Sequence, residues 1–345
     1  MKKVLFGTTA LIAAAAFAGT AHAERIKLSI GGKQEVWFGV ADVEDNAGET
    51  YASTGMATDT ELYFTGDTTL DNGLTVRAVI SLEADARGAQ NADETYIVMS
   101  GGFGAVQLGA REDVVMGQSW AAVELGGQDW DEAFGWSPDF EDHFAPTYYS
   151  VDDLSIGYTS PSFFGFSVAG SYAPDLAEPN DATGFQDWNN TDAAYKDAFA
   201  VGAAFNNEFT GIGIHADVGY WDQQGTRGVS DRNLVRGAVA LSYAGFELGG
   251  AYGVWDYEDT DTEVDTWLVG AGYENGPYGI DVNYARSETD DNAGDVEADY
   301  FKVAGKYILG PGVNLSASVF HTTYDDDAGD DREVTGGIMG VALSF

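Results

Sequence analysis

The sequence VTGGIMGVALSF, residues 334–345, ends the chain and decides its fold class. Counted back from the terminus, large apolar residues alternate with mostly small or weakly polar ones, and the large ones are Phe345, Leu343, Val341 and Met339. This period of two predicts a β-strand with two different faces. A terminal aromatic residue on such a strand is typical of transmembrane β-barrels, in which aromatic side chains mark the membrane–water interface. For this stretch alone, the alternative is the last strand of a soluble β-sandwich.

The N-terminus has the three parts of a secretory signal peptide. Lys2 and Lys3 precede an apolar stretch over residues 4–18, and Ala21-His22-Ala23 forms a small-residue cleavage site. We therefore expect residues 1–23 to be a signal peptide and residues 24–345 to form one barrel domain. No later segment approaches 18 consecutive apolar residues, so no transmembrane helix is predicted. The chain has no cysteine, which excludes disulfides and thiolate metal sites.

Composition favours a pleated sheet with short turns. The chain contains 45 Gly among 345 residues and 13 % aromatic residues, but only 7 Pro. A disordered acidic chain would lack these aromatic residues. The formal net charge of −40 excludes nucleic acid as a natural partner.

Short and long connections alternate along the sequence. Tight turn signals such as Asp71-Asn72-Gly73 and Asn275-Gly276-Pro277 are separated by longer polar segments, the longest of which covers residues 112–146. Seven short turns and eight long loops predict sixteen strands. Strict alternation gives the sheet two different edges, as in outer-membrane barrels with brief periplasmic turns and long outer loops. It also places both chain ends at the same edge, where the first and last strands can pair and close the sheet.

The predicted strands repeat the alternation of the C-terminus. Over residues 210–221, for example, one face carries Ile212, Ile214, Ala216, Val218 and Tyr220. About nine residues at a rise of ~3.3 Å and a tilt of ~40° span roughly 23 Å, which is close to the apolar band of outer-membrane barrels. Aromatic residues mark both ends of this band. Phe246, Tyr243, Tyr273, Tyr278, Tyr307 and Phe345 lie near short turns, and Tyr172, Tyr220, Tyr252 and Tyr284 near long loops.

Four stretches resemble the general-diffusion porins of Gram-negative outer membranes, the trimeric proteobacterial family. They are residues 339–345, 26–32, 101–111 (GGFGAVQLGAR) and 160–168 (SPSFFGFSV). The resemblance covers the whole mature chain. It implies a homotrimer of sixteen-stranded barrels in the bacterial outer membrane, surrounded by lipid and lipopolysaccharide, whose third long loop folds into the lumen as a constriction. Here that loop is residues 112–146, referred to below as loop 112–146. The terminal row Phe345, Leu343 and Val341 would serve as the assembly signal.

The resemblance also implies that acids of the loop face bases on the opposite wall. The loop acids are Glu112, Asp113, Glu124, Asp129, Asp131, Glu132, Asp139, Glu141 and Asp142. Strand parity assigns to the lumen the bases Lys33, Arg77, Arg111, Lys302 and Lys306. The same wall carries Glu35, Glu61, Glu83 and Glu94, which departs from a mostly basic ladder. For each acid taken singly, the alternative is a solvated loop charge. The aromatic loop residues Trp120, Trp130, Phe134, Trp136 and Phe140 are expected to anchor the loop, with sugar stacking as the alternative.

Passive diffusion of small hydrophilic solutes and ions is the predicted function, because sixteen strands enclose an aqueous lumen. The excess of lumen carboxylates predicts a preference for cations. The alternatives are a substrate-selective channel, for sugars for example, and a structural or adhesive barrel. No enzyme is predicted, since no histidine lies at metal-ligand or triad spacing. No cofactor is expected; acidic runs such as Asp325-Asp326-Asp327 leave Ca²⁺ or Mg²⁺ binding in outer loops open.

Overall fold

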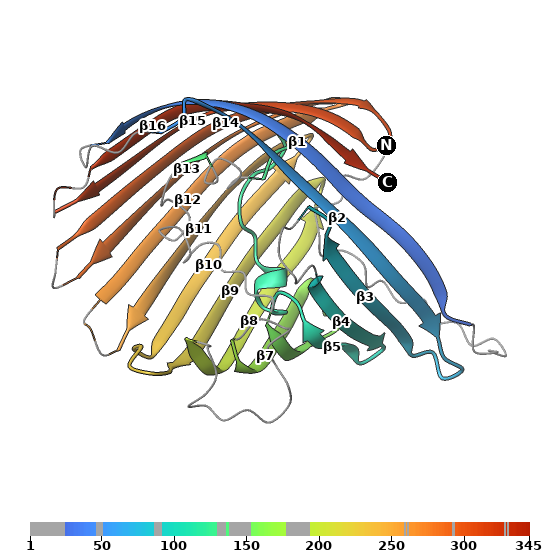
Figure 1. Ribbon diagram of the computed structural model, residues 1–345. Helices are drawn as coiled ribbons and strands as arrows, with labels where there is room; N and C mark the ends of the chain where they lie inside the picture. Colours follow the sequence, from blue (N-terminus) through green and yellow to red (C-terminus); the bar gives the residue numbers. More distant parts are fainter. Residues whose placement is uncertain are drawn as a thin grey trace.

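The protein is a closed antiparallel β-barrel. The computed structural model describes residues 25–45, 51–85, 92–129, 136–137, 153–176, 194–258, 260, 262–291, 294–327, 329 and 331–345. Within these residues the chain forms sixteen strands and one short 3₁₀ helix, η1 (Met116–Gln118) (Figure 1). The predicted fold class and strand number are confirmed. The predicted signal peptide, residues 1–23, lies outside the described residues.

The first eight strands are β1 (Lys27–Asp45), β2 (Thr54–Thr69), β3 (Thr75–Glu83), β4 (Ala92–Gly101), β5 (Gly104–Ala110), β6 (Leu154–Thr159), β7 (Phe166–Asp175) and β8 (Tyr195–Phe209). The last eight are β9 (Ile212–Gly225), β10 (Arg232–Tyr243), β11 (Phe246–Tyr257), β12 (Thr262–Asn275), β13 (Tyr278–Asp290), β14 (Val296–Gly310), β15 (Val313–Asp326) and β16 (Arg332–Ser344). Strands β3 to β7 are the shorter ones, with 6 to 10 residues each.

Each strand pairs with its neighbours in sequence, and β16 pairs with β1 to close the barrel. The closing register places Lys33 opposite Ser344 and Trp37 opposite Gly340. Closure leaves no strand edge for lipid to meet, which matters because hydrocarbon offers no hydrogen-bond partners to an open edge.

The two ends of the barrel differ as the sequence predicts. Short turns join β2 to β3, β4 to β5 and so on, whereas long loops join β1 to β2, β3 to β4 and so on. The β8–β9 and β10–β11 hairpins turn in two residues, Thr210-Gly211 and Ala244-Gly245, and all four have positive φ. Two consecutive positive φ values match the twist of the paired strands, which is why glycine occupies the second position.

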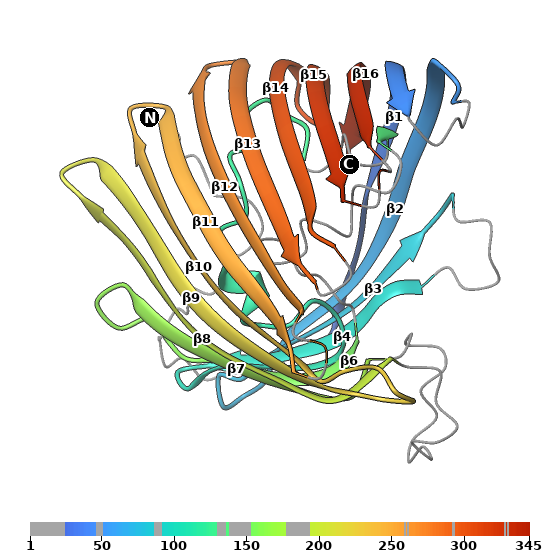
Figure 2. The same cartoon turned by 90° about the vertical axis from the view of Figure 1, so that its left-hand side faces the viewer.

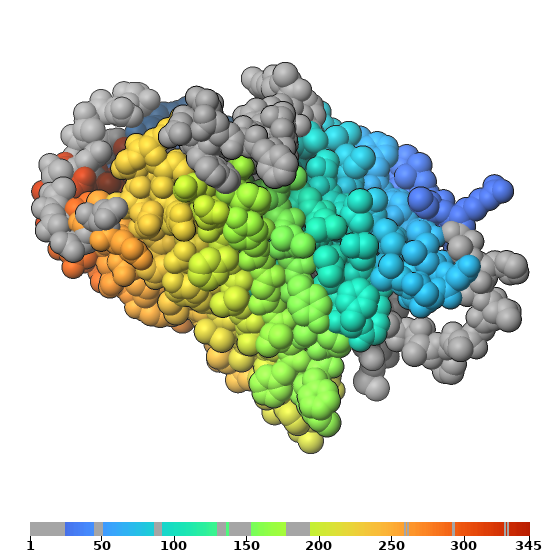
Figure 3. Space-filling view, turned by 90° about the horizontal axis from the view of Figure 1, so that it is seen from below, coloured from blue at the N-terminus to red at the C-terminus, as the bar shows by residue number. Residues whose placement is uncertain are grey.

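The apolar face of each strand points outward. Val218, Val239 and Leu248 are more than 40 % exposed on the outside of the barrel, and their neighbours in sequence face inward. Figure 2 shows the strands tilted around a central space, and Figure 3 shows the continuous outer surface formed over the early and middle strands. No helix in the described part of the chain is long and apolar enough to cross a membrane.

The buried core lies inside the barrel, where loop 112–146 packs against the wall. One cluster joins the loop residues Trp120 and Val123 to wall residues that include Leu268 and Ala285. A second joins Val115 and Met116 to Trp221. Both ribbon views show the segment after β5 running through the inside of the barrel (Figures 1 and 2). The predicted inward fold is therefore confirmed for the described residues of this loop, 112–129 and 136–137.

Candidate functional site

The described part of loop 112–146 begins with a tight turn that Asp113 holds. One carboxylate oxygen of Asp113, Oδ1, accepts the N–H groups of Val115 (2.7 Å) and Met116 (3.1 Å). The other, Oδ2, accepts Nε1–H of Trp221 on β9 (2.8 Å). Burial raises the pKa of the Asp113 carboxyl, since loss of water disfavours the charged form more than these hydrogen bonds favour it. Asp113 thus ties the start of the loop to the wall.

Further along, the wall binds the loop backbone at every third residue. Asp217 Oδ2 on β9 accepts the N–H of Trp120 (2.9 Å), and Arg236 Nη2 on β10 donates to the Trp120 carbonyl (2.7 Å). Asn283 on β13 binds both backbone polar groups of Val123: Oδ1 accepts its N–H (3.2 Å), and Nδ2 donates to its carbonyl (2.7 Å).

The same spacing continues to the end of this segment. Gly126 N–H donates to Asp281 Oδ2 on β13, and Lys302 Nζ on β14 donates to the Asp129 carbonyl. The segment is not straight, because it turns at residues 124–127, where Gly127 N–H donates to the Glu124 carbonyl (3.3 Å) and Gly127 has a positive φ. With this turn, the loop crosses from β9 to β14 bound to the wall.

Glycines on the lumen face let the loop approach the strands closely. A Cβ added at Gly249 would lie 2.4 Å from the Trp120 ring, and one at Gly279 would lie 1.9 Å from the Leu125 carbonyl oxygen. The space beside Gly202 is occupied in the same way by Val115, and the space beside Gly157 by Val114. These lumen positions are small because the loop occupies the space that a side chain would need.

The aromatic loop residues in the described range are anchors. Trp120 is buried, and its Nε1–H donates to Glu247 on β11 (3.1 Å). Trp136 lies against Gly39 on β1 and Gly55 on β2. Ser137 is paired with Thr322 on β15 (3.4 Å). The remaining aromatic residues singled out from the sequence, Trp130, Phe134 and Phe140, lie outside the described residues.

Of the loop acids predicted from the sequence, the described ones have different surroundings. Glu124 and Asp129 are exposed to the lumen, Glu112 is half-buried, and Asp113 is held against Trp221. The other predicted acids lie outside the described residues: Asp131, Glu132, Asp139, Glu141 and Asp142.

Two of the predicted bases are on the part of the wall that the loop covers. Lys302 is fully buried and donates to the Asp129 carbonyl. Lys306 pairs with Glu274 (2.6 Å), and the loop residue Gly127 lies against its side chain. Instead of facing the loop across the lumen, both lysines lie beneath it, because residues 125–129 of the loop run directly over β13 and β14.

The other three predicted bases each have an acidic partner. Lys33 on β1 lies 2.8 Å from Asp59 and 2.6 Å from Glu61 on β2. Arg77 pairs with Asp67 (2.6 Å), and Arg111 with Glu94 (3.5 Å) while stacking on the Tyr96 ring. This wall also carries Glu35 and Glu83, so its carboxylates outnumber its bases.

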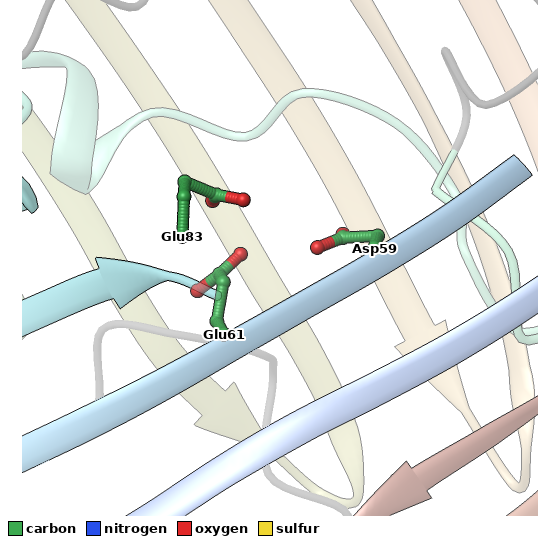
Figure 4. Close-up of side chains that lie close together, drawn as sticks. All are labelled: Asp59, Glu61 and Glu83. Atoms are coloured by element: carbon green, nitrogen blue, oxygen red, sulfur yellow. The ribbon is translucent and has the colours of Figure 1, made fainter. Parts of the chain in front are cut away.

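One group of carboxylates in the described residues is close enough to share an ion. Oxygen atoms of Asp59, Glu61 and Glu83 lie within 4.8 Å of one another, and Figure 4 shows the three side chains pointing toward one another from β2 and β3. Lys33 Nζ already contacts two of them. The group is therefore an ion-paired cluster with a surplus of negative charge.

Sequence reasoning did not assign the residues that hold the loop. Asp217, Arg236, Asp281 and Asn283 are all buried or nearly so on the lumen face. The available signal was parity, since polar residues alternate there with outward ones such as Val218 and Val282. Parity gives the face, but it does not give the loop residue that each one meets.

The predicted assembly residues form an outward row at the end of β16. Phe345, Leu343 and Val341 are 67 %, 36 % and 39 % exposed on the outside of the barrel. Their role in assembly remains a prediction.

Comparison with known proteins agrees with this architecture. A family model described as Gram-negative porin matches residues 9–327. No curated protein matches the chain in sequence. An anion-selective porin from Comamonas acidovorans superposes with a TM-score of 0.65 at 17 % identity, covering 93 % of this chain and 100 % of that one.

Two other solved structures are similar at the level of the fold. In vitro folded OmpT, an outer membrane protein of Vibrio cholerae in its trimer form, gives a TM-score of 0.62 at 12 % identity, with 93 % of this chain and 100 % of that one covered. A mutant of the Rh. blastica porin gives 0.57 at 16 % identity, with 92 % and 100 % covered.

Proposed function

We propose, because the chain belongs to the Gram-negative porin family, that it is a passive outer-membrane channel for small hydrophilic solutes and ions, with a preference for cations. Family and fold are those of non-enzymatic channels in the outer membrane. The finer proposal, the sign of the preferred ion, rests on the charges that the loop leaves accessible.

The observation that carries the preference is the burial of bases beneath the loop. Arg236 and Lys302 donate hydrogen bonds to loop carbonyls, and these two side chains are 1 % and 0 % exposed. On the β1–β5 wall, Lys33, Arg77 and Arg111 are each paired with carboxylates. Glu124 and Asp129 of the loop remain exposed. A pore lined by net negative charge concentrates cations.

The zero-current potential across a KCl gradient at neutral pH tests this proposal. We expect the cation-selective sign, largest in dilute salt, because screening lengths of ~30 Å at ~0.01 M shrink to ~3 Å at ~1 M. An anion-selective sign would overturn the preference and leave the channel itself in place.

Passive diffusion is favoured over a sugar-selective pore because the described loop tryptophans are engaged. Trp120 is buried against Gly249 and offers no open ring face, and Trp136 is partly buried with its ring against Gly39 and Gly55. Saturable block of conductance by a sugar would favour the alternative.

We further propose that the barrel functions as a homotrimer in a lipid and lipopolysaccharide environment. At the long-loop end, outward aromatic residues lie on β7 to β14, including Tyr172, Tyr252 and Trp267. In the described ranges of β15, β16 and β1–β6, no outward tyrosine or tryptophan lies at that end. Aromatic girdles mark lipid contact. In its described residues, the arc from β15 through β1 to β6 lacks this girdle at the long-loop end, so it is the surface that contacts the other two copies in the proposed trimer.

Native mass spectrometry in mild detergent checks the oligomeric state. A trimer is expected. A stable monomer that conducts would contradict the assembly without affecting the channel proposal.

A further inference from the structure

Two clamps on adjacent parts of the loop share one geometry. At Trp120, Asp217 accepts the backbone N–H and Arg236 donates to the backbone carbonyl of the same residue, and their own atoms Oδ1 and Nη1 lie 3.3 Å apart. At Val123, Asn283 alone binds both sides. Each clamp supplies the donor and the acceptor that a neighbouring strand would otherwise supply.

We propose that Asn283 and Arg236 are positioning residues of the pore: they hold loop 112–146 against the wall and keep the open cross-section constant. The guanidinium of Arg236 binds the loop backbone and does not interact with the passing ion. This inference rests on the proposed channel function.

The wall is shaped around the Asn283 clamp. Gly270 on β12 lies opposite Asn283, and a Cβ at this glycine would lie 2.2 Å from Asn283 Oδ1. A Cβ at Gly272, two residues further, would lie 2.7 Å from Val123. Both Asn283 and Val123 are 0 % exposed. The two glycines therefore make room for the amide and for the residue it holds.

Arg236 requires a guanidinium to perform its part. One nitrogen, Nη2, donates to the Trp120 carbonyl, while Nη1 faces Asp217, which in turn accepts the Trp120 N–H. A lysine keeps the positive charge but is a single-point donor and cannot reproduce this fork. Charge and positioning can therefore be separated by one conservative substitution.

The experiment compares single-channel records of the full-length protein and four variants. Asn283→Leu removes the amide, Gly270→Ala displaces it without deleting it, and Arg236→Lys keeps the charge but loses the fork. Thr266→Val is the matched control, because it removes a buried hydrogen bond between two wall residues, Thr266 and Ser287 (3.0 Å).

We expect a several-fold rise in open-channel current noise in the first three variants, with brief closures, and none in Thr266→Val. The zero-current potential of Arg236→Lys should equal that of the wild type. Hydrogen exchange of the Trp120–Val123 segment should be faster in Asn283→Leu than in Thr266→Val, whether or not the protein conducts.

Noise and loop exchange that match the control would overturn the inference, because they would mean that other contacts hold the loop. A wild-type protein that forms no channel would overturn the proposed function, while loop exchange would still decide on the clamps.

Discussion

Phe345 and Gly32 exchange two backbone hydrogen bonds, Gly32 N–H to the Phe345 carbonyl (2.9 Å) and Phe345 N–H to the Gly32 carbonyl (3.1 Å). The last residue of the chain thus extends the β16–β1 ladder that closes the barrel. Its ring remains 67 % exposed on the outer surface.

Deleting Phe345 should lower the amount of protein in the outer membrane while leaving the conductance of refolded protein intact. Each lost hydrogen bond contributes roughly 0.5–1.5 kcal/mol, a small part of a ladder of sixteen strand pairs. The measurement is the outer-membrane level by quantitative blotting, with Leu343→Ala as a milder comparison. Wild-type levels after deletion would argue against an assembly role.

Excising residues 118–140 should raise single-channel conductance and move the zero-current potential toward anions. The first effect follows from removing a segment that crosses the lumen, and the second from uncovering Arg236 and Lys302 while Glu124 and Asp129 are lost. Both are read in planar bilayers. Unchanged conductance would place the excised segment outside the conducting path.

Lys33→Met should make the pore more cation-selective, because Asp59 and Glu61 lose their common partner at the lumen wall. Arg286→Met is the matched control: it removes a base from the outward face of β13, where Arg286 pairs with Glu288, Glu297 and Asp299. The zero-current potential should change in the first variant and not in the second. Equal potentials in both would show that the cluster lies off the ion path.

Asp113→Asn should change how loop stability depends on pH. Burial raises the pKa of the Asp113 carboxyl in the folded protein, so the folded state holds the proton more tightly than the unfolded state. Wild-type stability should therefore fall as pH rises from the usual aspartate range through the raised value. The variant lacks this dependence, since an amide does not titrate.

Limited proteolysis of the loop in detergent, followed from pH 4 to pH 8 as a rough range set by ordinary carboxyl pKa values, measures this effect. Relative to the wild type, the loop of the variant should become more resistant to cleavage as the pH rises. If the ratio of the variant's cleavage rate to that of the wild type stays constant across this pH range, the raised pKa of Asp113 is contradicted.

The barrel follows from patterns of neighbouring residues in the sequence. Period-2 alternation in stretches such as 210–221 and 334–345 specifies which face meets lipid, and alternating turn lengths specify antiparallel neighbours and a common edge for both termini. These are local properties, because neighbouring residues set both the two faces of a strand and the length of a hairpin turn. The inward position of loop 112–146 came from resemblance and is confirmed for residues 112–129 and 136–137, which the structure describes.

Which charges line the pore depends on contacts between distant parts of the chain, and the sequence pattern does not show them. Parity places both Lys33 and Lys302 in the lumen, yet Lys33 lies beside Asp59 and Glu61 whereas Lys302 lies beneath the loop at the Asp129 carbonyl. That contact joins residues 173 positions apart in the chain. It depends on the path of residues 120–129 across β9 to β14. No periodicity encodes this path, because it is set by lumen glycines and polar side chains on strands far from the loop in sequence.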